Sequence, residues 1–283
     1  MNSPLFGTVD HARVINFGHA QGYWALAGAG FRRWSTYRQA AVAGVFVNTV
    51  FGVIKLSILL GVAESAGGTV AGYDAESLST YTWMSQGMIA VVLIFTWTEL
   101  ADRVRTGDIA VDLARPVDLQ LAWLAADLGR AAWGLVSRAL VPIAFGAVFF
   151  GFALPDNRWM LALLPLSLTL AVVISFACRF MLNLVAFWIT EIRGLVLFYV
   201  LFSGMLGGHL IPVQLFPDWL RIVALATPFP AMIQWPINLV TGQTSGWAAV
   251  GLIVAQVGWA VALLVAGRLV LARATRKLVV QGG

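Results

Sequence analysis

The sequence predicts an all-α integral membrane protein with six transmembrane helices, and three observations support this prediction. Hydrophobic residues make up 60% of the 283 residues and charged residues 11%, whereas a soluble domain has about 25% charged residues. The mean hydropathy is +0.84. Six apolar runs approach the ~20 residues that a helix needs to cross a bilayer, and basic residues gather in alternate connections between them.

The apolar runs set the order of the predicted spans. They lie at about 40–62, 80–100, 132–153, 159–183, 194–210 and 247–271. Before the first run, residues 22–38 combine aromatic and aliphatic side chains with a basic end, which is typical of a helix lying at the lipid headgroups. The whole chain, 1–283, is therefore treated as a single six-span domain.

The basic residues orient these spans. One set of connections and termini holds Arg13, Arg32, Arg33, Arg38, Arg103, Arg105, Arg115, Arg193, Arg268, Arg273, Arg276 and Lys277. The opposite set holds Arg158 and Arg221, and its connection 63–79 has acidic residues but no basic one. Since positive charge accumulates on the cytoplasmic side, both termini are expected in the cytoplasm.

The connection between the second and third runs contains an unusually polar stretch, RTGDIAVDLARPVD, at 105–118. Gly107 can end the preceding helix and Pro116 cannot continue the next one, so a helix of about two turns is expected between them. Asp108 near its start and Arg115 near its end both complement the helix dipole. The sequence therefore predicts a short, capped helix on the cytoplasmic side.

Two apolar residues of this helix, Ile109 and Leu113, are expected to be exposed and to fit a groove on a soluble partner. Together with Val111 they are expected to supply more of the docking energy than the charged residues, because surface ion pairs contribute little. The alternative is a solvated loop that only joins two spans. The stretch resembles a segment of type-2 ABC exporter permeases in which an acidic and aliphatic helix follows a Gly and precedes a Pro. Other stretches resemble the same family, namely NTVFG at 48–52, YTWMSQG at 81–87, LFPDWLRIVALATPFP at 215–230 and ATRKLVVQGG at 274–283.

This resemblance to the permease (transmembrane) subunit of a type-2 ABC exporter implies a coupling helix at 105–118 that docks on separate cytoplasmic ATPase subunits. It also implies a second permease copy or a paralogous permease as partner, in the bacterial inner membrane. The residues assigned to ATPase coupling are Glu99, Asp102, Arg103, Arg105, Gly107, Asp108, Ile109, Asp112, Leu113, Arg115 and Pro116. The first four of these are expected to extend the helix of the second span into water.

The chain has no G-x-x-x-x-G-K-[ST] phosphate loop, which is the sequence signature of an ATP site of this kind. ATP and Mg are therefore expected on the partner ATPase, with no cofactor and no enzymatic activity on this chain. His11, His19 and His209 lie in different segments, so no metal site is expected. Ser203 and His209 are six residues apart and would point to different faces of a helix, which argues against a nucleophile pair.

Residues 211–246 contain five prolines and do not form a clean span. Non-helical backbone at membrane depth survives only where protein or a water-filled cavity satisfies its polar groups. Two short helices at about 216–226 and 229–241 meet this condition, and the family resemblance implies re-entrant helices here that cap the exit of the transport path. The alternative is an interfacial loop with Trp219 and Trp235 at the headgroups.

Polar side chains inside the spans are candidates for the translocation path, because each is costly in hydrocarbon. They are Asn48, Lys55, Gln86 and Arg179. For Lys55 and Arg179 the alternative is snorkelling to the interface, and for Asn48 and Gln86 it is contact with another helix or across a dimer. Asp127 and Arg130, three apart, are expected to pair with each other, and Trp83 is expected to anchor at the outer headgroups.

Two further function classes stay open at this stage. A passive channel or a membrane scaffold is the alternative to an exporter of a hydrophobic or amphipathic substrate, and an intramembrane enzyme is the least favoured class. Nucleic acid is not an expected partner, because the basic residues do not cluster on a polar domain. Membrane lipids are expected partners, and the sequence does not identify the cargo.

Overall fold

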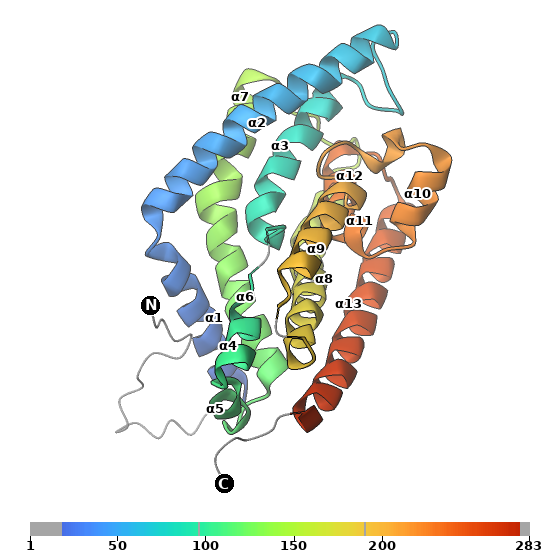
Figure 1. Cartoon of the computed structure of the whole chain (residues 1–283). Coiled ribbons are helices and arrows are strands. Elements are labelled where there is room, and N and C mark those ends of the chain that lie inside the picture. Colours follow the sequence, from blue (N-terminus) through green and yellow to red (C-terminus); the bar gives the residue numbers. More distant parts are fainter. Residues whose placement is uncertain (1–18, 96, 190, 278–283) are drawn as a thin grey trace.

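The computed structural model describes residues 19–95, 97–189 and 191–277, which fold into helices without a β-strand. Helices α1 (His19–Ser35), α4 (Glu99–Thr106) and α5 (Ile109–Leu113) lie at one end of an elongated bundle, where α13 (Trp247–Ala274) also ends (Figure 1). The short helices between α9 and α13 lie toward the other end. The all-helical class is confirmed, while His11, Arg13 and residues 278–283 lie outside the described residues.

Four helical segments are long and apolar enough to cross a bilayer. They are Arg38–Ser65 (α2), Leu119–Phe149 (α6, Leu119–Gly134; a π-helical turn, Leu135–Ala139; and α7, Leu140–Phe149), Arg158–Phe187 (α8, Leu164–Leu184, flanked by 3-10 turns) and Trp247–Lys277 (α13 and a 3-10 turn). They correspond to the first, third, fourth and sixth predicted spans. The third begins well before the predicted residue 132, because Asp118 caps it by accepting from the amide of Leu121 at 2.8 Å.

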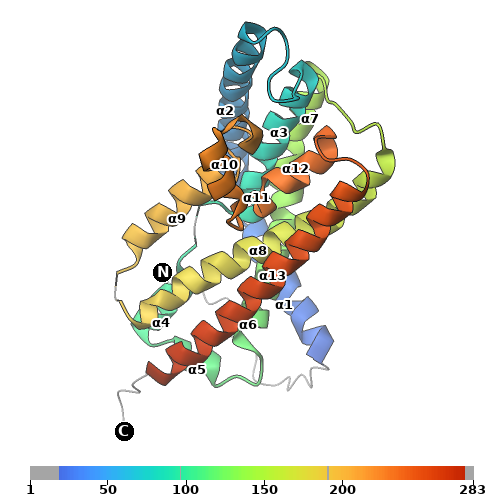
Figure 2. The same cartoon turned by 90° about the vertical axis from the view of Figure 1, so that its right-hand side faces the viewer.

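The other two predicted spans correspond to α3 (Ala75–Val92) and α9 (Arg193–Leu206). Nearly every side chain of α3 is buried, since α3 runs through the centre of the bundle. A helix enclosed by other helices does not need an apolar surface, which explains its many hydroxyl and amide groups. Helix α9 has 14 residues. In Figure 2 it lies apart from α8, and it contacts α11 (Phe229–Met232).

Helix α3 has well-defined ends. At its start, the Asp74 carboxylate accepts a hydrogen bond from the amide of Ser77 at 2.9 Å, and the Ser77 hydroxyl oxygen accepts one from the amide of Asp74 at 2.9 Å. The hydrogen bonds from Ser77 hold the pKa of the Asp74 carboxyl below its usual range. The helix ends at Val92, because Leu93 adopts a left-handed conformation with φ of 51°.

The indole of Trp83 lies in the middle of the bundle, so the prediction that it anchors at the headgroups is wrong. Its side chain is fully buried, between Gly52 of α2 and Gly146 of α7. A Cβ at Gly146 would overlap the indole ring. The two glycines create the space for the Trp83 side chain. The prediction failed because it used only the position of Trp83 near one end of its span.

Helix α1 packs closely along α6 (Figure 1). Gly30 faces the backbone of Ala126, and Gly129 faces the backbone of Ala27, each so closely that a Cβ would overlap a carbonyl oxygen. Small residues that let two backbones approach are a common basis of helix packing in membranes. The predicted helix at 22–38 therefore exists as α1, and it is held by protein contacts as well as by any contact with lipid.

Replacing Gly30 with Ala is expected to destabilise the protein by about 1–3 kcal/mol, the usual cost of forcing extra volume into a packed contact. Gly28→Ala is the matched control on the same helix, because its Cβ would lie 3.3 Å from the movable end of Arg32. The thermal midpoint of the purified protein in detergent measures both effects. Equal midpoints for the two variants would show that α1 does not depend on this contact.

The proline-rich segment folds into α10 (Asp218–Leu225), α11 and α12 (Gln234–Thr241). All eight residues of α12 are buried, and Trp235 is 8% exposed whereas Trp219 is 68% exposed. The alternative of an interfacial loop is therefore wrong for residues 229–241. The exposure of Trp219 does agree with the position that this alternative gave it. The amide of Gln256 in α13 secures this region by donating to the carbonyl of Ala231 at 2.8 Å.

Candidate functional site

Helices α4 and α5 form a compact unit, here called the α4–α5 hairpin (residues 99–113). Gly107 joins them with φ of 84°, a conformation that glycine adopts without strain. The guanidinium of Arg103 forms a bidentate pair with the carboxylate of Asp112, with Nη2 to Oδ1 at 2.9 Å. Since Asp112 is 2% exposed, this pair closes the hairpin instead of facing a partner.

The exposed surface of the hairpin differs from the prediction. Ile109 is 1% exposed and packs among Leu100, Trp123 and neighbouring apolar residues, so its predicted role as an exposed anchor is wrong. The reason is that α5 has only one short apolar face, which the bundle buries. Val111 is 58% exposed, and Asp108 is exposed beside it.

Leu113 is half-buried and lines a cleft of about 360 Å³ between the end of the hairpin and α13. The cleft also contains the ion pair between Asp118 and Arg268. Arg115 and Pro116 lie between these two groups in the sequence, and Pro116 is exposed. The cleft therefore gives the surface next to α5 a hollow with both apolar and charged walls.

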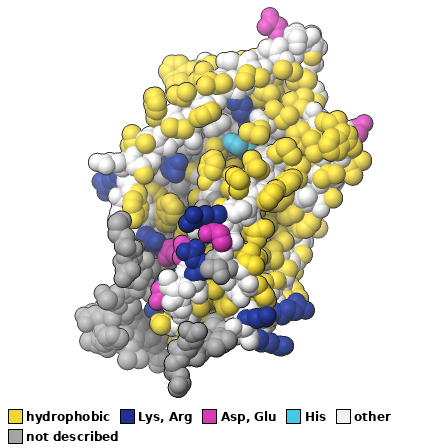
Figure 3. Space-filling model, in the orientation of Figure 1, with side chains coloured by type: hydrophobic (Ala, Val, Ile, Leu, Met, Phe, Trp, Pro, Cys, Tyr) yellow, Lys and Arg dark blue, Asp and Glu magenta, His cyan; other side chains and the backbone are white. Residues whose placement is uncertain are grey.

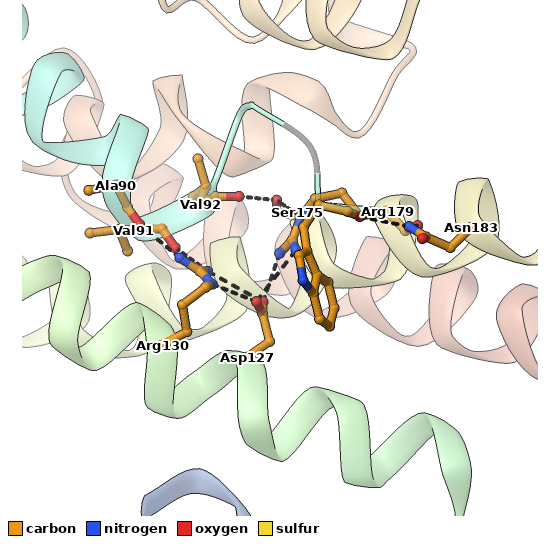
Figure 4. Close-up of polar contacts among 9 residues, drawn as sticks. Ala90, Val91, Val92, Asp127, Arg130, Ser175, Arg179 and Asn183 are labelled. Atoms are coloured by element: carbon orange, nitrogen blue, oxygen red, sulfur yellow. Dashed lines mark hydrogen bonds and ion pairs between the residues drawn. The ribbon is translucent and has the colours of Figure 1, made fainter. Parts of the chain in front are cut away.

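The predicted extension of the second span into water is also wrong. Helix α3 stops at Val92 and α4 begins as a separate helix at Glu99. The last carbonyls of α3 accept from side chains instead of from a further helical turn (Figure 4): Arg130 donates to Ala90 and Val91, each at 2.8 Å. The hydroxyl of Ser175 donates to the carbonyl of Val92, so the broken end of α3 is satisfied inside the bundle.

The side chains that satisfy this end belong to a buried charge cluster, defined as Asp127, Arg130 and Arg179 (Figure 4). The carboxylate of Asp127 lies 2.6 Å from Arg130 Nε and 2.7 Å from Arg179 Nη2. All three residues are at most 4% exposed. The predicted pairing of Asp127 with Arg130 is confirmed, whereas the snorkelling alternative for Arg179 is wrong.

A side chain of α8 connects this cluster to the hairpin. Asn183 Nδ2 donates to the carbonyls of Arg179 at 2.8 Å and Trp97 at 3.0 Å. Its Oδ1 accepts from the amide of Ala101 in the first turn of α4 at 3.0 Å. Glu99, at the start of α4, pairs with Arg33 of α1 at 2.8 Å, so α4 is attached to both α8 and α1.

The remaining coupling and path residues are more dispersed. Asp102 pairs locally with Arg105 at 3.4 Å, and both side chains are exposed. Asn48 donates to the carbonyl of Gln86 at 3.3 Å, which is the contact with another helix that was the alternative to a role in the path. The side chain of Lys55 in α2 also contacts α3, whereas Arg179 belongs to the charge cluster. The four predicted path residues therefore do not meet in one place.

Sequence reasoning missed Ser175, Asn183 and Trp97 as parts of this network. A signal for two of them exists, because Ser175, Arg179 and Asn183 recur every four residues and therefore share one face of α8. Trp97 packs against Trp123 with ring centroids 4.6 Å apart and the rings tilted by 54°, and no pattern in the sequence indicated this pair. In the part of the chain that the structure covers, no group of three or more His, Cys, Asp and Glu could hold a metal.

The long apolar helices and the enclosed polar network define a multi-pass helical membrane protein. The chain matches the family described as ABC-2 family transporter protein over residues 50–282, and it belongs to that family. It is thus a transmembrane permease of the ABC transporter class. A comparison with curated proteins found no match.

Proposed function

We propose that this permease is the membrane subunit of an ATP-driven exporter that moves a hydrophobic or amphipathic substrate. In this proposal the chain crosses the bacterial inner membrane six times, with both termini in the cytoplasm. Two permeases, identical or paralogous, form the path, and separate ATPase subunits bind ATP and Mg. The observation that carries the proposal is the attachment of the α4–α5 hairpin to α8 through Asn183 and to α1 through Glu99.

Charge distribution supports the orientation. Basic side chains gather at the end of the bundle that contains the hairpin and the end of α13 (Figure 3), as expected for a cytoplasmic end. Helix α3 would be the second span, with its polar side chains enclosed by neighbouring helices. Helix α9, about 21 Å long, would be the fifth, with the chain after it completing the crossing and leading to re-entrant helices α10–α12.

The hairpin has the properties of a coupling element. Because the Arg103–Asp112 pair and Ile109 hold it as one unit, a push on its exposed face would move it as a rigid body. The motion would reach α8 through Asn183 and then α6 and α3 through the charge cluster. Energetic coupling along this route is measured by substitutions at the exposed residues of the hairpin.

Val111→Asp is expected to reduce co-purification of the ATPase and vanadate-sensitive transport at least tenfold, the equivalent of about 1.4 kcal/mol of docking free energy. The substitution places a charge at the centre of the proposed docking face without touching a buried residue. Arg273→Gln, an exposed change at the cytoplasmic end of α13, is the control. Unchanged coupling in Val111→Asp, or conduction without nucleotide as in a passive channel, would contradict the proposal.

A further inference from the structure

The charged group of Lys55 lies within the apolar part of α2. It is one of only two lysines in the sequence, and it is ten residues before the end of α2 at Ser65. At a rise of about 1.5 Å per residue, it lies about 15 Å along the helix from that end. An ionic group at this depth is costly unless something compensates its charge.

The ammonium of Lys55 has two hydrogen-bond acceptors. Nζ donates to the hydroxyl of Ser85 in α3 and to the carbonyl of His209 after α9, both at 2.6 Å. It also lies 4.6 Å from the centroid of the Tyr81 ring, in the range of a cation–π contact. Because an ammonium has three hydrogens, one donor position is left over.

No counter-charge accompanies Lys55 in the part of the chain that the structure describes. Within residues 19–95, 97–189 and 191–277, no carboxylate lies within the 4.0 Å that defines an ion pair with Nζ. The neighbouring His209 has a buried Nδ1 without a hydrogen-bond partner in this same part of the chain. Lys55 Nζ and His209 Nδ1 therefore lie near each other, and each has hydrogen-bonding capacity that the described residues do not fill.

The surface around this place is apolar. Lys55 and His209 are each half-buried as whole residues, and the Nδ1 atom of His209 is buried. Phe51 and Ile58, one turn to either side of Lys55 on α2, are 61% and 63% exposed. On α9, before His209, Phe202 is 45% exposed.

We propose that Lys55 and His209 form a site for the anionic headgroup, a phosphate or a carboxylate, of an amphiphile whose chain lies along the apolar faces of α2 and α9. The headgroup supplies the missing counter-charge and accepts the remaining ammonium hydrogen. Neutral His209 can donate through one ring nitrogen. Only the identification of this amphiphile as cargo rests on the proposed export function, because the site itself depends on the permease chain alone.

Photolabelling of the purified full-length permease tests the site without an ATPase. The probe is hexadecyl phosphate with a diazirine in its chain, used at neutral pH, and the matched neutral probe is the corresponding hexadecanol. The phosphate is expected to label peptides containing Phe51, Ile58 and Phe202 about tenfold more than the alcohol. This factor corresponds to a hydrogen bond with a charged group.

The variants separate charge from fold. Lys55→Gln is expected to remove the preference for the phosphate at these peptides, whereas Lys55→Arg keeps it and Lys277→Gln, the other lysine, leaves it unchanged. Equal labelling by the phosphate and the alcohol in the wild-type protein would overturn the proposal even if Lys55→Gln does not fold. A preference that persists in a folded Lys55→Gln variant would overturn it as well.

A second arm identifies the source of the headgroup. Phosphatidylglycerol with the same photoreactive chain competes for the site if the occupant is a bilayer lipid, whereas labelling by hexadecyl phosphate alone indicates a single-chain amphiphile. Both outcomes support the anionic site. If labelling succeeds while ATP-driven transport of hexadecyl phosphate by the complex fails, the export of this class of molecule is contradicted and the site stands.

Discussion

Asp127→Asn is expected to destabilise the protein by about 3–5 kcal/mol, the cost of removing one partner from a buried ion pair. The change leaves Arg130 and Arg179 buried with their charges uncompensated. Arg130 also holds the end of α3 through the carbonyls of Ala90 and Val91, so its displacement would unsettle α3. The thermal midpoint in detergent and the yield of folded protein measure this effect.

Asp102→Asn is the matched control for Asp127→Asn. Asp102 also pairs with an arginine three residues away, but its side chain is 54% exposed, and such surface pairs contribute about 0–1 kcal/mol. Adding Arg179→Met to Asp127→Asn removes one of the two unpaired charges and should recover part of the loss. Equal midpoints for Asp127→Asn and Asp102→Asn would show that the cluster does not support the fold.

Gly146→Val is expected to be nearly as damaging, with a loss of about 3 kcal/mol at the upper end of the range for overpacking. Any Cβ at this position overlaps the indole of Trp83, which is fully buried and cannot move aside without displacing α2 or α3. Thermal stability in detergent and resistance to proteolysis measure the result.

The control for Gly146→Val is Gly258→Val in α13, where an added Cβ would have open space around it. Combining Trp83→Leu with Gly146→Val reduces the volume of the ring against which the new side chain collides. The double variant should therefore be more stable than the sum of the two single losses predicts. Strict additivity would contradict the proposed packing of Trp83.

The main features of the fold were predictable because a helix that crosses the hydrocarbon core of a bilayer must be long and apolar. The long apolar runs became α2, α8 and α13 with boundaries close to those expected. Helix α3 was less predictable at its inner end, because the sequence does not reveal that Arg130 and Ser175 replace its last turn. The apolar run continues past Val92, so composition extended the helix where side-chain hydrogen bonds end it.

The candidate site was predictable in location but not in its exposed surface. The polar stretch at 105–118 does contain a short helix after Gly107. A five-residue helix has too few positions for periodicity to tell its buried face from its exposed one. Ile109 and Asp112 therefore proved to be internal, whereas Val111, also expected to contribute docking energy, is exposed.

We expect the α4–α5 hairpin to dock on an ATP-hydrolysing subunit. The most direct test places the photoreactive amino acid benzoylphenylalanine at Val111 in cells that express the native complex, with Leu140, an exposed residue of α7, as the control position. Our account predicts a cross-link from position 111, and none from position 140, to a protein that contains a G-x-x-x-x-G-K-[ST] phosphate loop. Cross-links from position 111 to lipid or to other permease chains alone would contradict it.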